Sequence, residues 1–132
     1  MKYTLKSTIA LILFLLFTFM TTKVWANQHS SSDWSGFSQQ IKHCKKEQFI
    51  LRVNDKPYPQ IFRIQGWEGQ KCVLSIQDQP PKDIITTEIL YCDLNQNDLD
   101  WLSEFAQMKI AERENTMKDY RVFIEKKCEM IY

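Results

Sequence analysis

Four cysteines constrain the fold of this 132-residue chain most strongly, because a segment typical of exported proteins precedes them. The chain starts with a short basic stretch, continues with an apolar run from Ile9 to Met20, and then carries small residues at Val24 and Ala26, as signal peptidase requires. Export would place the cysteines in an oxidising compartment, where disulfide bonds are their expected fate. We therefore expect two structural disulfides, formed by Cys44, Cys72, Cys92 and Cys128.

A membrane anchor is the alternative interpretation of the N-terminal segment. Its apolar run has twelve residues before Thr21 and Lys23 end it, whereas a spanning helix needs about 20. No cysteine that could accept a lipid lies near the expected cleavage site. The sequence thus predicts a cleaved signal peptide, residues 1–26, and one domain, residues 27–132. This domain is expected in the periplasm or outside the cell, without a stable membrane anchor.

Removal of the predicted signal peptide changes the sign of the net charge. The chain has 17 basic and 16 acidic side chains, and Lys2, Lys6 and Lys23 lie in the segment that cleavage removes. The remaining residues carry 14 basic and 16 acidic side chains, a formal charge of −2. Because nucleic-acid-binding domains are usually strongly basic, this balance argues against nucleic acid as a partner.

Hydrophobic periodicity predicts an α+β domain. A helix is expected from the capping residue Asp33 to about residue 46, because apolar residues recur there every three or four positions: Trp34, Phe37, Ile41 and Cys44. Four segments are typical of strands, and a turn with two glycines, residues 66–69, joins the second to the third. These strands are expected at residues 49–53, 61–65, 70–77 and 84–92.

The third and fourth predicted strands suggest a disulfide pairing. If they form an antiparallel hairpin centred near residue 82, Cys72 lies across from Cys92, close enough for a cross-strand disulfide. Cys44 and Cys128 are then the second pair. Sequence alone permits three connectivities, of which this register favours one.

The C-terminal third is predicted to be helical. Apolar residues recur at helical spacing from Leu99 to Ile131, and a break or bend is expected at residues 114–116. A short edge strand from Tyr120 to Ile124 is the alternative.

Together the predicted helices and strands indicate an antiparallel sheet of three or four strands, packed against N-terminal and C-terminal helices and stapled by two disulfides.

Residues 93–104 resemble a calcium-binding loop. Oxygen-bearing side chains occupy positions 1, 3, 5 and 12 of an EF-hand pattern, namely Asp93, Asn95, Asn97 and Glu104. However, Asp98 stands where the loop needs glycine, and a strand leads in where a helix is required. In the simpler interpretation Asn97 caps the next helix and Asp98 lies near its positive end. We therefore assign no metal ligand.

A second hypothesis depends on the disulfide pairing. A bond between Cys44 and Cys128 would gather basic residues at one corner of an acidic protein: Lys42, His43, Lys45, Lys46, Lys126 and Lys127. Such a corner could bind a phosphate, an anionic lipid head group or an acidic polysaccharide. The alternative is a solvated helix end, since cations favour helix C-termini.

Trp67, in the hairpin turn, is expected either as an exposed binding anchor or folded back over the sheet.

Nothing in the sequence points to a catalytic site. The nucleophile, zinc-protease and phosphate-loop motifs are missing, as is any Cys-x-x-Cys pair for zinc. His43 and Cys44 are neighbours on a predicted helix and point apart, so they form no catalytic pair. Carboxylates such as Glu68, Glu88 and Glu104 are scattered, without a spacing that selects two of them. We expect no catalytic residue and no cofactor.

Four predicted elements follow one another in a fixed order. They are a helix ending in Cys44, a strand with Gly69-Gln70-Lys71-Cys72, a strand ending Tyr91-Cys92-Asp93-Leu94, and a Leu99-x-x-Leu102 helix. This order resembles small exported proteins of Gram-negative bacteria without known function. The resemblance implies no site residues. We expect a non-enzymatic exported protein that binds a protein or an anionic ligand, as a periplasmic accessory or inhibitor or as a secreted factor. A calcium-dependent module is the first alternative and a small secreted hydrolase the second.

Overall fold

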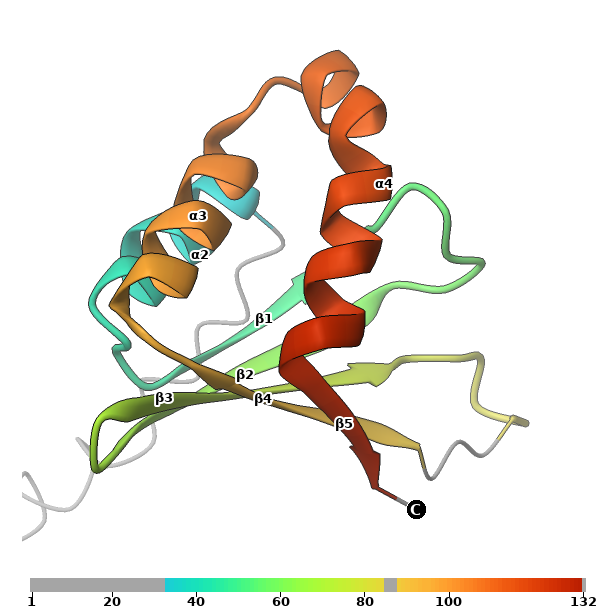
Figure 1. Cartoon of the computed structure of the whole chain (residues 1–132). Coiled ribbons are helices and arrows are strands. Elements are labelled where there is room, and N and C mark those ends of the chain that lie inside the picture. The colour runs from blue at the N-terminus through green and yellow to red at the C-terminus, as the bar shows by residue number, and fades with distance from the viewer. Residues whose placement is uncertain (1–32, 85–87, 132) are drawn as a thin grey trace, which may run out of the picture.

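The computed structural model describes residues 33–84 and 88–131, in which a five-stranded antiparallel sheet carries three helices on one face (Figure 1). The predicted signal peptide lies outside the described residues. The elements in chain order are α2 (Trp34–Lys42), β1 (Glu47–Leu51), β2 (Gln60–Glu68), β3 (Lys71–Asp78), β4 (Ile89–Leu94), α3 (Gln96–Gln107), α4 (Ile110–Lys127) and β5 (Cys128–Ile131). The α+β class and the antiparallel sheet are confirmed, with five strands where three or four were expected.

The strands lie in the sheet in the order in which they occur in the chain, β1-β2-β3-β4-β5. The chain leaves the sheet after β4, forms α3 and α4 over one face, and returns as β5 beside β4 (Figure 1). Helices α2 and α3 pack side by side, and α4 lies over another part of the same face. The face opposite the helices has no described helix or strand packed on it.

The core lies between the sheet and the helices. Alternate strand residues point to this side, as the period of two in a strand requires. The largest fully buried side chains are Phe37, Phe49, Phe62, Phe105, Ile41, Leu51, Leu74, Leu94, Leu99 and Leu102. Aromatic contacts attach α4 to α3, since Phe105 stacks on Tyr120 with ring centroids 4.8 Å apart and Trp101 stacks on Phe123 at 4.6 Å.

The disulfide pairing predicted from the sequence is wrong. The bonds join Cys44 to Cys72 and Cys92 to Cys128. In the β3–β4 ladder Cys72 pairs with Leu94, and Cys92 pairs with Leu74, so the hairpin is shifted by two residues from the expected register. A shift of two keeps both cysteines on the helix side of the sheet but separates them diagonally.

Each cysteine has a nearer partner than the predicted one. Cys128 follows α4 directly and pairs with Cys92 across β4 and β5. Cys44 follows α2 and has a positive φ of 51°, an unusual conformation for a residue other than glycine. This turn ends the helix and brings Cys44, which is buried, to β3.

The C-terminal elements also differ from the prediction. The helical region is interrupted at Met108 and Lys109, both with extended backbone, and not at residues 114–116. Tyr120 to Ile124 lies within α4, so the edge-strand alternative is wrong for these residues. The last described residues, Cys128–Ile131, form the edge strand β5 where helix was expected. Apolar residues at 124, 128 and 131 fit a helix, but pairing with β4 decides the conformation.

Two helix N-termini show how local sequence sets the boundaries. Asp33 caps α2 as predicted, because its carboxylate accepts a hydrogen bond of 2.9 Å from the Ser35 amide. Helix α3 begins two residues earlier than predicted and is capped by Asn95, not Asn97. The Asn95 side chain accepts from the Asp98 amide and the Asp98 carboxylate accepts from the Asn95 amide, each at 2.9 Å, which forms a capping box.

Candidate functional site

A row of four isoleucines and one glutamine crosses the face of the sheet that the described helices leave uncovered. The cross-strand pairs are Ile50 with Ile61, Ile61 with Gln77, Gln77 with Ile89, and Ile89 with Ile131. We call these five residues the isoleucine row. Ile50, Ile61 and Ile89 are partly exposed, and Ile131, on the edge strand, is 53% exposed. A sheet face open to solvent normally carries polar residues at such positions, so four aligned isoleucines are unusual.

A polar row runs beside the isoleucine row, formed by Gln48, Arg63, Ser75, Tyr91 and Glu129. Arg63 joins the two rows, because its guanidinium donates to Gln48 Oε1 at 3.0 Å and to Gln77 Oε1 at 3.1 Å. These two bonds hold the guanidinium along the sheet surface. Ser75 stands between Arg63 and Tyr91 and is only 2% exposed, so the large side chains on this face shield its centre from water.

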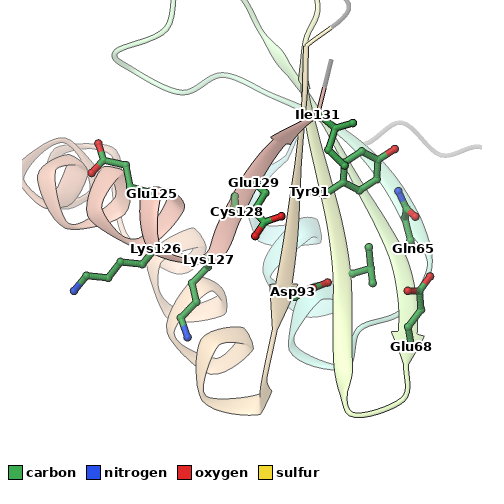
Figure 2. Close-up of a pocket in the computed structure, with 11 residues that line it drawn as sticks. Gln65, Glu68, Tyr91, Asp93, Glu125, Lys126, Lys127, Cys128, Glu129 and Ile131 are labelled. Carbon is green, nitrogen blue, oxygen red and sulfur yellow. The ribbon is translucent and has the colours of Figure 1, made fainter.

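A hollow of about 580 Å³ lies on this face, beside β4, β5 and the end of α4 (Figure 2). Glu68, Asp93 and Glu129 are exposed carboxylates of its wall, borne by β2, β4 and β5. Tyr91 of β4 also lines the hollow (Figure 2). The hollow therefore adds an acidic region to one end of the uncovered face.

Two lysines also line the hollow, and one of them has an ion partner outside it. Lys127 Nζ lies 3.2 Å from Asp98 Oδ1 at the start of α3. Its side chain extends away from the sheet surface in Figure 2. The carboxylates on the strands therefore dominate the surface next to Tyr91.

The structure does not bring the predicted calcium ligands together. Asp93 is on β4, Asn95 caps α3, and Asn97 and Glu104 are exposed residues of that helix, about two turns apart. Because the helix begins at Gln96, residues 96–104 cannot wrap around an ion. Within residues 33–84 and 88–131 there is also no group of three or more His, Cys, Asp or Glu that could hold a metal.

The basic corner loses the disulfide on which it depended, since Cys44 bonds to Cys72 and Cys128 to Cys92. The basic residues near these cysteines have other neighbours. Lys127 pairs with Asp98, and the side chain of Lys46 lies along Gly66 on β2. The disulfides therefore do not join the two segments that carry these basic residues.

Trp67 is neither fully exposed nor fully folded over the sheet. It lies near the end of β2, opposite Cys72, and is 45% exposed. It is not part of the isoleucine row.

The isoleucine row was missed by sequence analysis, although a signal was present. A strand with one solvated face alternates apolar and polar residues, whereas Phe49-Ile50-Leu51 and Ile61-Phe62 are apolar at consecutive positions. Such runs indicate that both faces of the strand avoid water. The row itself depends on the register between strands, which the sequence did not define.

Comparisons with models of protein families, with curated proteins and with solved structures found no match. In the described part of the chain, no helix combines the length and apolar character needed to cross a membrane.

Proposed function

We propose that this chain is an exported, non-enzymatic protein that binds a partner protein through the uncovered face of its sheet. The observation that carries this proposal is the isoleucine row. Four isoleucines on a sheet face open to water are costly to leave exposed, and apolar surfaces of this kind commonly mark protein interaction sites. No described element of the chain covers the row.

The chemistry of the face suggests the chemistry of the partner. An apolar ridge on the partner would lie along the isoleucine row, and the Arg63 network would exclude water beside it. The hollow with Glu68, Asp93 and Glu129 would then favour basic residues at one end of that ridge, because complementary charge guides association and fixes orientation.

The location of the protein is the second part of the proposal. Two disulfides in the described residues indicate an oxidising compartment outside the cytoplasm. With the predicted signal peptide, this supports export to the periplasm or the medium. An accessory or inhibitor in the periplasm would be retained with the cells, whereas a secreted factor would accumulate in the culture supernatant.

Site-specific cross-linking tests the binding face in the producing cell. A photo-crosslinking amino acid introduced at Ile61 is expected to trap a single partner, identified by mass spectrometry. The same amino acid at Lys118, an exposed position on α4, is the matched control and should not trap it. Equal trapping from both positions, or none from Ile61, would overturn the proposed face.

A further inference from the structure

A second cavity, of about 180 Å³, lies on the opposite side of the sheet, beneath α4. Ile76 of β3, Leu90 of β4 and Ile124 of α4 form its apolar walls. The loop between β1 and β2 closes one side, and it lies next to α4 in Figure 1. Hydrogen bonds of 3.0 Å from Asn54 to Glu114 and from Arg121 to Asp55 tie this loop to the helix.

Tyr120 gives this cavity a hydroxyl group that has no partner among the described residues. The residue lines the cavity and is only 4% exposed, with its ring stacked on Phe105. Its hydroxyl forms no hydrogen bond with any of the described residues. Buried hydroxyl groups are nearly always hydrogen-bonded, because leaving one unpaired is costly.

The Tyr120 hydroxyl is a donor at ordinary pH. Burial raises the pKa of Tyr120, and the negative charge of Asp55 raises it further. Asp55 and Tyr120 both line the cavity. The phenol therefore keeps its proton and needs an acceptor.

The charged groups around the cavity balance one another. Arg121 and Asp55 form an ion pair of 3.0 Å, while Lys56 and Glu125 contribute one further charge of each sign. Gln60, also in the wall, donates to Asp78 at 2.8 Å. The rim thus has no excess charge that would select an ionic ligand.

We propose that this cavity binds a small neutral molecule that carries one hydrogen-bond acceptor on an apolar body. The acceptor takes the Tyr120 hydroxyl hydrogen bond, and the apolar body lies against Ile76, Leu90 and Ile124. This site is separate from the binding face, because the sheet lies between them.

Cyclohexanone is a suitable probe, since it has one carbonyl acceptor on a small apolar ring. Titration into the exported protein with both disulfides intact, followed by amide NMR shifts, should give saturable changes at Ile76, Leu90 and Ile124. Tyr120→Phe keeps the stacked ring and removes the donor, so the Kd should rise about fivefold. Tyr91→Phe, on the opposite face of the sheet, is the matched control and should leave the Kd unchanged.

Two results would overturn the proposal: no saturable shifts at these three residues, or the same Kd in the Tyr120→Phe variant. Nuclear Overhauser contacts between cyclohexanone and the methyl groups of Leu90 and Ile124 provide a test that needs no variant. Their absence at saturating cyclohexanone would contradict the site even if Tyr120→Phe fails to fold.

Discussion

Cys92 and Cys128 lie directly opposite each other on β4 and β5 and are joined by a disulfide, with Cα atoms 4.0 Å apart. This bond attaches the last strand of the chain to the sheet at the point where α4 ends. Because β5 has only four residues and pairs on one side, the disulfide is its strongest link to the fold.

Replacement of both residues, Cys92→Ala with Cys128→Ala, should lower the free energy of unfolding by about 4 kcal/mol, as the chain-entropy model gives for a bond spanning 36 residues. Denaturant unfolding measures this loss. Hydrogen exchange should show faster exchange in β5 first, while β2 and β3 stay protected. The expectation fails if the β5 amides remain as protected as in the parent protein.

A non-reducing peptide map tests the pairing itself. It should yield the peptide pairs Cys44 with Cys72 and Cys92 with Cys128, since each pair is brought together by the fold. Recovery of Cys72 linked to Cys92 would require the β3–β4 register to shift by two residues and would contradict the sheet described above.

The cap of α3 offers a matched pair of asparagines. Asn95→Ala should lower the free energy of unfolding by about 1 kcal/mol, because it removes the acceptor for the Asp98 amide. Asn97→Ala should change it by less than about 0.5 kcal/mol, since Asn97 is exposed. Thermal or urea unfolding distinguishes the two. A larger effect at Asn97 would restore the cap expected from the sequence.

Tyr120 should make the free energy of unfolding depend on pH in the alkaline range. Its pKa is raised in the folded protein, so the unfolded chain loses this proton first, at its ordinary pKa of about 10. The contribution of Tyr120 to the free energy of unfolding is fully present below about pH 10. Above that pH it declines by up to about 1.4 kcal/mol per pH unit.

Urea unfolding at pH 9 and pH 11, compared between the parent protein and Tyr120→Phe, isolates this dependence from that of the lysines. The variant should lose less stability than the parent between the two values. Equal losses would show that Tyr120 is not shielded as the structure describes.

The sequence predicted the class of fold well because that class depends on local patterns. The α2 helix followed from its Asp33 cap and its apolar spacing, and β3 followed from a run of apolar residues between turns. These signals lie within single elements. They do not depend on which strands become neighbours.

The register and the C-terminal strand could not be predicted in this way. A shift of two residues in β3–β4 leaves the same residues facing the core, so hydrophobic pattern alone cannot distinguish the registers. Cys128–Ile131 fits a helix or a strand equally well, and only the edge of β4 selects the strand. The disulfide prediction was wrong for the same reason, because it rested on the register.

The candidate site depended on these undefined features. The isoleucine row exists only when all four ladders are in their observed registers, and Ile131 joins it only because β5 is a strand. The calcium hypothesis instead used residues close in sequence, which the fold directs to different neighbours, and the basic-corner hypothesis depended on a Cys44–Cys128 bond that does not form.

The affinity of the protein for the partner trapped at Ile61 tests the central claim most directly. Ile89→Gln places a second amide in the isoleucine row, between Gln77 and Ile131, and should weaken binding by tenfold or more, which corresponds to about 1.4 kcal/mol. Ile110→Gln, at an exposed isoleucine at the start of α4, is the control and should leave the Kd unchanged. If the partner binds both variants as tightly as the parent protein, the uncovered face of the sheet is not the binding surface.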